Sequence, residues 1–258
     1  MAQPSISNPI KILVNKSIES SIFPENIKAA QVSPLFKKNN SLDKGNYIPV
    51  SVLPCISKIY ERAIHDQLMD FLDKHFPSLL SAFRPGFGCQ TALIKIIDDW
   101  KKALDDNKFI AAILMDLSKA FDCLPHNLLL LKLEAYGLSK NSLKLLQSYL
   151  ENRKQRIKIG SYYSDWDQMC KGIPQRSILG PVLFKIFIND IFLFVQNSTI
   201  YIYADDNTVS YCDYDINKVV NTLEVDSLKL VNWFSINLMK ANPDKFQAIV
   251  IGKKNNII

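Results

Sequence analysis

The sequence predicts an α+β fold in which a sheet is backed by helices. From residue 109 onward, apolar segments with strand-like and helix-like spacing alternate in the order strand, helices, strand, helix, hairpin, helix, strand. This order is typical of a mixed sheet with helices on one face. Of the 258 residues, 48% are hydrophobic and 22% are charged, which is the composition of a folded chain and excludes disorder.

The elements that begin this order follow from their apolar spacing. Residues 56–73 carry apolar side chains at helical intervals, and residues 91–107 repeat the pattern. Residues 109–115 (FIAAILM) are apolar at consecutive positions, as in a strand covered on both faces, and the run stops at Asp116. We therefore expect two helices followed by a buried strand that ends on a carboxylate.

The later elements follow the same two periodicities. We expect helices at 125–136, 141–152, 178–194 and 216–239, strands at 157–160, 199–203, 208–211 and 246–251, and a hairpin turn at 204–207. The apolar run 178–195 contains Lys185 and Asp190, so no membrane span is expected. The N-terminus lacks the pattern of a secretory signal, and we expect an intracellular protein of the nucleus or cytoplasm.

Two acidic residues are expected at one rim of the sheet. Asp116 ends the buried strand and Asp205 lies at the tip of the hairpin. Carboxylates that meet in this way suit Mg²⁺, which prefers oxygen ligands and keeps water or substrate phosphates in its shell. The five cysteines form no CxxC pair, and the three histidines stand apart, so oxygen ligands are the alternative that remains for a metal.

The neighbouring Asp206 is expected to diverge from Asp205, because side chains alternate along a strand. Only one of the two should then point at Asp116, and Asp205 is favoured as the stronger ligand. The competing interpretation is that each acid is only a polar strand end or a turn former, as we expect for 98–99 and 105–106. A formal net charge of +6 indicates a polyanionic partner, or else an ordinary solvated basic surface.

Several motifs in this order resemble the reverse transcriptases of non-LTR (LINE, jockey-like) retrotransposons. They are the hairpin 203–206 (YADD), the strand and turn 115–122 (MDLSKAFD), the loop 171–181 (KGIPQRSILGP) running into 187–190 (FIND), the segments 46–51 (NYIPVS) and 83–86 (FRPG), and the closing segment 238–252. The resemblance covers nearly the whole chain. It implies a polymerase of right-hand architecture with fingers and palm and with the thumb absent.

The resemblance assigns roles to individual residues. Asp116, Asp205 and Asp206 match the catalytic metal-binding acids, and Lys245 matches a lysine that protonates pyrophosphate. The other matches are to substrate-binding residues: Phe121 as an aromatic gate that selects dNTPs, Gln175 at the incoming nucleotide or at the template near the 3′-hydroxyl, Lys37 and Lys38 near the triphosphate, and Arg84 in a fingers motif. A buried core aromatic is the alternative for Phe121, and a solvated lysine is the alternative for Lys245.

The implied activity is RNA-directed DNA synthesis by two-metal nucleotidyl transfer. It implies two Mg²⁺ ions, with Mn²⁺ as a substitute, an RNA template, a DNA primer and dNTPs, and no membrane partner. We expect residues 1–108 to form a fingers-like region with helices that link to the palm, and residues 109–258 to form the palm with the acids.

Two positions depart from the family pattern. Ile48 stands where an arginine is usual, which removes a permanent charge, and Arg176 stands where a glycine is usual. Glycine at such a place allows an unusual φ or a close approach of substrate to the backbone. These departures favour the alternative function, a catalytically degenerate fragment of the same fold that only binds nucleic acid, whereas the intact acids favour the polymerase.

Overall fold

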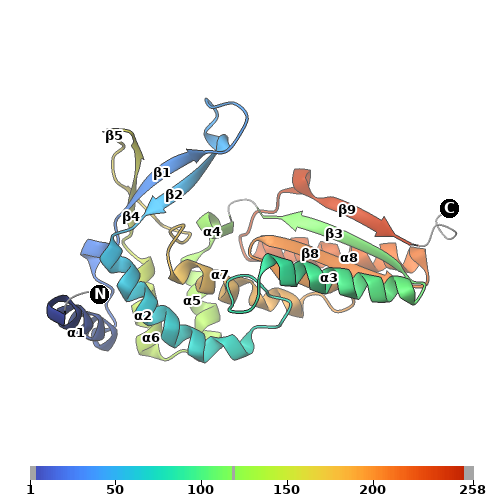
Figure 1. Ribbon diagram of the computed structural model, residues 1–258, viewed down its shortest axis with the longest axis horizontal. Coiled ribbons are helices and arrows are strands. Elements are labelled where there is room, and N and C mark those ends of the chain that lie inside the picture. Colours follow the sequence, from blue (N-terminus) through green and yellow to red (C-terminus); the bar gives the residue numbers. More distant parts are fainter. Residues whose placement is uncertain (1–3, 118–119, 253–258) are drawn as a thin grey trace. The chain divides into compact units, whose positions relative to one another are not determined.

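The computed structural model describes residues 4–117 and 120–252 (Figure 1). Its helices are α1 (Pro4–Ser20), α2 (Cys55–Leu72), α3 (Cys89–Asp105), α4 (Ala120–Cys123), α5 (His126–Ala135), α6 (Lys140–Leu150), α7 (Leu179–Ile188) and α8 (Ile216–Ile236). Its strands are β1 (Ala30–Phe36), β2 (Tyr47–Val52), β3 (Phe109–Asp116), β4 (Lys154–Ile159), β5 (Tyr162–Tyr163), β6 (Asp167–Gln168), β7 (Thr199–Tyr203), β8 (Asp206–Asp213) and β9 (Gln247–Ile251). The α+β class is confirmed.

The chain forms two compact units. Unit 1 comprises residues 1–73 and 124–184, and unit 2 comprises residues 74–123 and 185–258. The boundary expected between residues 108 and 109 does not separate these units, because the chain crosses from one unit to the other after residues 73, 123 and 184. The last of these crossings lies within α7.

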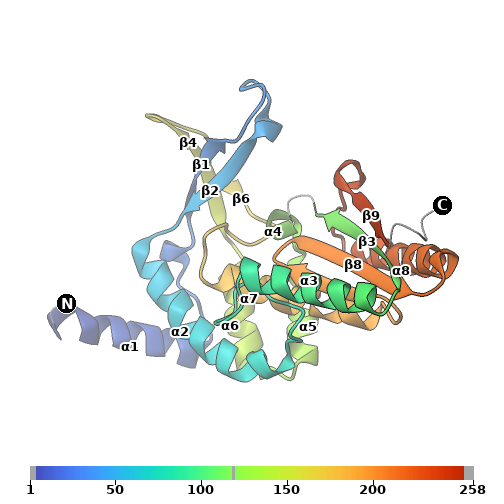
Figure 2. The ribbon, with the colours of Figure 1, turned by 45° about the vertical axis from the view of Figure 1, so that its right-hand side comes forward.

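Unit 1 contains a mixed sheet. The strand order is β2-β1-β4-β5, with β6 also paired to β4 (Figure 2). β1 is antiparallel to β2 and parallel to β4. Neither β1 nor β2 was predicted from the sequence. Elsewhere in unit 1, the Phe23 ring packs edge-on against the rings of Tyr60 and Tyr149, with centroids 5.9 and 5.0 Å away.

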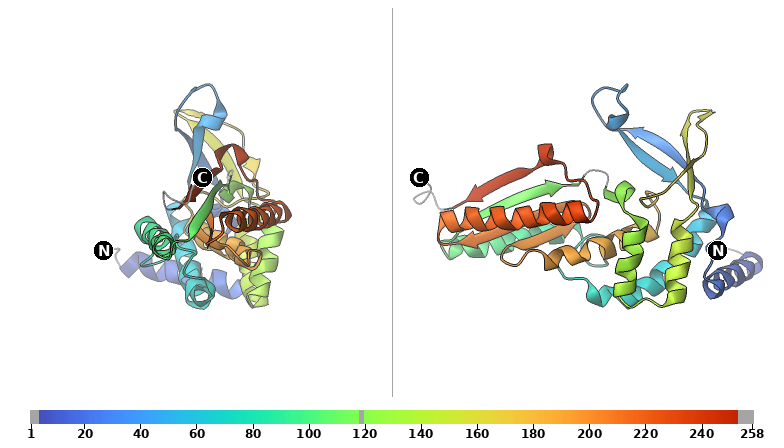
Figure 3. Two further views of the ribbon diagram at one scale, coloured as in Figure 1. Left: turned by 90° about the vertical axis from the view of Figure 1, so that its right-hand side faces the viewer. Right: turned by 180° about the vertical axis from the view of Figure 1, so that it is seen from behind.

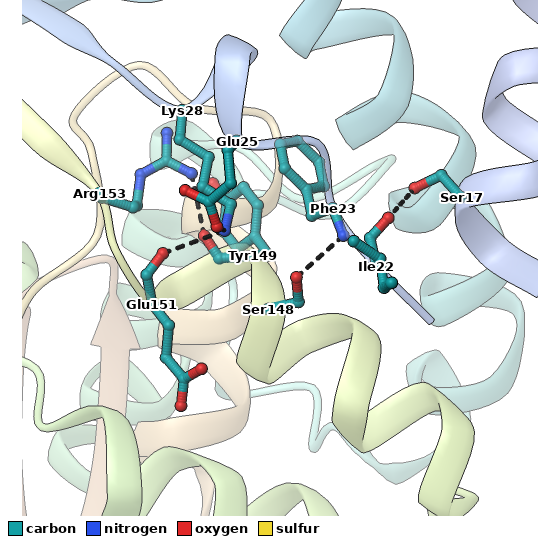
Figure 4. Close-up of polar contacts among 9 residues, drawn as sticks. All are labelled: Ser17, Ile22, Phe23, Glu25, Lys28, Ser148, Tyr149, Glu151 and Arg153. Atoms are coloured by element: carbon teal, nitrogen blue, oxygen red, sulfur yellow. Dashed lines mark hydrogen bonds and ion pairs between the residues drawn. The ribbon is translucent and has the colours of Figure 1, made fainter. Parts of the chain in front are cut away.

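A buried lysine joins the N-terminal part of unit 1 to α6. Lys28 is 1% exposed, and its Nζ donates to Glu25 Oε1 at 2.7 Å and to the carbonyl oxygen of Glu151 at 3.1 Å (Figure 4). Nearby, the backbone N–H of Phe23 donates to Ser148 Oγ at 3.0 Å. These bonds satisfy polar groups that would otherwise destabilise a buried site.

Unit 2 contains an antiparallel sheet of strand order β7-β8-β3-β9. Helices α3 and α8 cover its two opposite faces (Figure 3). The expectation of helices on one face only was therefore wrong for this sheet. The reason why both faces are covered is visible in β3. Phe109, Ile110, Ala111 and Ala112 are all buried, so successive side chains on both faces need a cover.

The helix α8 packs through one apolar stripe that includes Val219, Leu230, Trp233 and Phe234, whose side chains are all essentially inaccessible to solvent.

The helix predicted at 178–194 is shorter in the structure, since α7 stops at Ile188 and a 3₁₀ segment, Asn189–Leu193, follows. Among the described residues, no helix combines the length and the apolar character needed to cross a bilayer.

Candidate active site

Two of the predicted acids lie opposite each other at the end of the unit 2 sheet. Asp116 is the last residue of β3, Asp206 is the first residue of β8, and the antiparallel register pairs them directly. Opposed residues in a sheet project to the same face. The register thus places Asp206, rather than the favoured Asp205, across from Asp116, whereas the shared rim was correctly predicted.

Asp205 lies in the tight turn between β7 and β8. Tyr203 pairs with Asp206, so only Ala204 and Asp205 form the turn, instead of the four residues 204–207 expected. Ala204 has a φ of +58°, a conformation that two-residue hairpins normally give to glycine. A non-glycine residue in this region is strained, and such strain is concentrated at functional sites.

The three acids share one negative electrostatic field. Burial raises the pKa of Asp206, and the charges of Asp205 and Asp116 raise it further, while Lys245 opposes the shift. This set of carboxylate oxygens fits a hard divalent cation, because a cation would relieve the repulsion between them. As the side chains stand, no group of three acidic, histidine or cysteine residues in the described part of the chain forms a ready metal cage.

A lysine near the C-terminal end of the sequence partly neutralises the charge of these acids. Lys245 Nζ donates to Asp116 Oδ2 at 3.0 Å, across 129 residues of sequence. The lysine is placed by the 3₁₀ segment Pro243–Lys245, which is tied to β3 because the N–H of Asn242 donates to the Asp116 carbonyl oxygen at 3.0 Å. The structure therefore places Lys245 beside Asp116, within the candidate site.

Asp116 and Asp206 line a cleft of about 670 Å³ on the α3 side of the sheet. The first turns of α3 form one wall, and the strand ends with Lys245 form the other. The lining residues are Cys89, Ala92, Leu93, Ile96, Leu114, Met115, Asp116, Tyr203, Asp206, Asn207, Thr208, Asp244, Lys245 and Gln247. A space of this size next to carboxylates is suited to a small polar ligand.

The candidate gate Phe121 lies in unit 2, in the short helix α4. Its ring packs edge-on against Phe83, with centroids 6.2 Å apart and an angle of 87° between the planes. Phe83 has a φ of +59°, and its carbonyl oxygen accepts from Lys185 Nζ at 2.9 Å. Lys185 is 2% exposed and also lies 4.9 Å from the Phe76 ring centroid.

Lys185 was not predicted as part of the site, although one signal was available. It is a lone charge in the apolar run 178–188, and a buried charge of this kind requires a partner. Ser118 and Lys119, which complete the motif that carries Asp116 and Phe121, lie outside the described residues.

Arg84 makes several contacts inside unit 2. Its Nη1 donates to the carbonyl oxygen of Pro77 at 2.9 Å, with longer bonds of 3.4 Å to those of Phe76 and Leu80. Its guanidinium also lies 4.5 Å from the Phe87 ring centroid. These contacts hold the turn before the motif 83–86, so substrate binding by Arg84 stays a prediction.

The other candidates belong to unit 1. Lys37 and Lys38 are exposed directly after β1, in the loop to β2, and Ile48 is 39% exposed on β2. Gln175 lies in the turn before α7, next to Arg176, which has a φ of +66°. Arg176 therefore has an unusual φ of the kind that a glycine at this place would allow.

Comparison with known proteins identifies the family of this fold and site. A sequence model described as "Reverse transcriptase (RNA-dependent DNA polymerase)" matches residues 36–256. The chain is a member of the reverse transcriptase family. The family that the motifs predicted is thus confirmed.

Relatives from Drosophila melanogaster agree with this reverse transcriptase assignment. The chain is 26% identical over 92% of its length to the "Probable RNA-directed DNA polymerase from transposon BS", and 29% identical over 70% to the "RNA-directed DNA polymerase from mobile element jockey". It covers 27% and 20% of these two proteins, so it spans about a quarter of the relatives' length. The resemblance to non-LTR retrotransposons is confirmed.

Solved structures share the fold at low sequence identity. Apo telomerase from Candida tropicalis, truncated from its C-terminal domain, superposes with a TM-score of 0.64 at 13% identity. The match covers 98% of this reverse transcriptase chain and 57% of the telomerase chain. The right-hand polymerase fold predicted from the sequence is confirmed by this similarity.

The shared field of the acids predicts a pH-dependent change in stability. Because the folded state raises the pKa of Asp206 above 3.8, stability is lost as the pH rises through the folded value. We expect Asp206→Asn to have a higher Tm than the parent at pH 7 in chelator, with the difference vanishing toward pH 3.

A matched control for this prediction is Asp98→Asn. The pKa of Asp98 is lowered, chiefly by its hydrogen bond from Lys102, so removal of its charge should not raise the Tm. Addition of Mg²⁺ should raise the Tm of the parent more than that of Asp206→Asn. An equal rise in both proteins would contradict a cation site at these acids.

Proposed function

We propose that the chain is an RNA-directed DNA polymerase that extends the 3′-hydroxyl of a DNA primer on an RNA template, using dNTPs. The observation that carries the proposal is the field shared by Asp116, Asp205 and Asp206 at the end of one sheet, with Lys245 bonded to Asp116. The names of the matched relatives support the same reaction. The proposed location is the nucleus or cytoplasm, where template and dNTPs are both present.

The three carboxylates would hold two Mg²⁺ ions, for which Mn²⁺ could substitute. When bound, such ions lower the pKa of the attacking hydroxyl and stabilise the leaving pyrophosphate in an in-line transfer. Lys245 holds a proton at Nζ, 3.0 Å from Asp116 Oδ2, and can give it to the departing pyrophosphate.

The remaining candidates would bind the substrates. Phe121, supported by Phe83, presents an aromatic ring that would exclude a 2′-hydroxyl. Lys37 and Lys38 would contact the triphosphate, Gln175 the incoming nucleotide, and Arg84 the template or nucleotide through the motif it stabilises. Phosphates attract such cations with a strength that falls as salt rises.

A second function is favoured by two observations in unit 1. Arg176 places a long cationic side chain on a backbone that favours glycine, and Ile48 exposes an apolar side chain where an arginine is usual in the family. A chain altered in this way could bind nucleic acid without extending a primer. Primer extension separates this binding function from the polymerase.

The gate role predicts a change in sugar selectivity. With the smaller side chain of Phe121→Val, we expect the ratio of kcat/KM for dNTP over rNTP to fall by about 10-fold or more, because space for one added hydroxyl opens. The measurement is single-nucleotide primer extension on an RNA template. A core aromatic without gate function would instead lower Tm and leave the sugar ratio unchanged.

A further inference from the structure

Glu61, in the middle of α2, is a fully buried acid that plays no part in the site described above. It is 0% exposed, although burial strongly disfavours a charged carboxylate and raises the pKa of Glu61. An acid is kept at such a place only when it is well bonded. Its partners are therefore informative.

The partners of Glu61 lie far away in the sequence, at the start of α7. Its Oε2 accepts from the backbone N–H of Ile178 at 2.5 Å and of Leu179 at 3.3 Å. Its Oε1 accepts from Ser57 Oγ at 3.3 Å, within α2. The carboxylate thus satisfies two of the first N–H groups of α7, which have no partner inside the helix, and its charge complements the helix dipole.

The third N–H group of α7 is satisfied by the loop itself. Gly180 N donates to Ser177 Oγ at 3.0 Å, and a Cβ at Gly180 would lie 2.6 Å from that oxygen. The turn immediately before is closed by the N–H of Ser177, which donates to the Pro174 carbonyl oxygen at 3.1 Å. Gln175 lies inside this turn, so the carboxylate of Glu61 anchors the end of the segment that carries it.

A buried cation favours the charged form of Glu61. Arg153 is 1% exposed, its Nη1 donates to the Tyr149 carbonyl oxygen at 3.0 Å, and its charge lowers the pKa of Glu61. Figure 4 shows Arg153 and Tyr149 side by side near Lys28. The carboxylate therefore holds the loop from the core of unit 1, which moves little compared with a surface side chain.

We propose that Glu61 is a positioning residue for the incoming nucleotide, because it fixes the turn 174–177 and hence Gln175 by bonding the first N–H groups of α7. This inference rests on the proposed function for its effect on dNTP binding. The anchoring of the loop is a property of unit 1 that can be measured separately. The two parts can consequently fail independently.

The test compares Glu61→Gln with Asp226→Asn. Gln keeps the shape of the side chain but removes its charge, and charge-assisted hydrogen bonds are the stronger ones, so we expect amide hydrogen exchange of residues 175–180 to accelerate by about tenfold. Asp226 is a matched control, since it is also 0% exposed and accepts from two backbone N–H groups, those of Asn197 at 3.2 Å and Ser198 at 2.8 Å. Asp226→Asn should accelerate exchange at 195–199 and leave 175–180 unchanged.

In primer extension, Glu61→Gln should raise KM for dNTP by about tenfold with kcat within about twofold, and Asp226→Asn should raise neither. Should Glu61→Gln fail to fold, Glu61→Asp, which keeps the charge on a shorter stem, is expected to show a smaller rise in the same two quantities. Unchanged exchange at 175–180 in the folded variant, or an equal KM rise in Asp226→Asn, would overturn the proposal. Accelerated exchange in Glu61→Gln, when neither the parent nor Arg176→Gly extends a primer, would overturn the proposed function and leave the anchoring established.

Discussion

Asp116→Asn is expected to lose primer extension by about 10²-fold or more, the scale on which one electrostatic stabiliser of a transition state is lost. Asn keeps the volume of the side chain but removes the charge that faces Asp206 in the register and bonds Lys245. The measurement is extension of a DNA primer on an RNA template with Mg²⁺ and dNTPs. Tm should change little, because the relief of repulsion on Asp206 is offset by the loss of the bond from Lys245.

The matched control for this loss is Asp98→Asn. Asp98 is an acid of unit 2 with a 52% exposed side chain, bonded to Lys102 at 2.7 Å on the outside of α3. Exposed pairs of this kind contribute little, so its extension rate should equal that of the parent. If both substitutions were harmless, Asp116 would be a polar strand end and nothing more.

Arg176→Gly is expected to raise both stability and activity. Release of the left-handed backbone gains about 1–2 kcal/mol, and the greater freedom of glycine in the unfolded chain offsets about 0.4–1 kcal/mol of it. The net gain of about 0.5–1 kcal/mol should raise the Tm by about 1–4 °C. Extension should rise as well, because a cationic side chain leaves the turn that carries Gln175.

Arg176→Ala separates the two causes. Alanine removes the side chain but retains a Cβ, so the φ of +66° stays strained and the Tm should not rise. If extension rises equally in both variants, the Arg176 side chain is what hinders nucleotide binding. If extension rises only in Arg176→Gly, the strained backbone is what hinders it. A lower Tm for Arg176→Gly than for Arg176→Ala would contradict the claim that the backbone at this position is strained.

Much of unit 2 could be predicted from apolar spacing, because its elements bury one stripe or both faces. The buried run 109–115 became β3, and the carboxylate at its end lies on the rim where it was expected. The two faces of β3 could also have predicted two helical layers, since a strand apolar on both sides needs a cover on each. The one-sided arrangement expected for the sheet ignored this requirement.

The sheet of unit 1 could not be predicted in the same way. β1 and β2 contain Pro34 and Pro49, and proline inside a run argues against a strand. The structure pairs these two prolines with each other, so the missing N–H groups fall on a single rung of the ladder. The pairing of β1 with β4 ends at Val32, before this rung is reached.

Long-range contacts explain why the sequence did not predict the partners of two buried charges, Glu61 and Lys185. The bonds from Glu61 to Ile178 and from Lys185 to Phe83 each span more than 100 residues, and periodicity carries no information at that distance. The lone charge in each apolar stripe was the available signal, because a buried charge requires a partner. The resemblance to the family predicted Lys245 as a site residue, whereas its ion pair with Asp116 was not predicted and is seen in the structure.

The most direct test of polymerase function is single-nucleotide extension of a DNA primer on an RNA template, offering each dNTP in turn with Mg²⁺. We expect incorporation of only the dNTP complementary to the templating base, in the parent or at least in Arg176→Gly, and no incorporation in Asp116→Asn or in chelator. Binding of the primer-template without incorporation in any of these proteins would contradict it and leave nucleic-acid binding as the function.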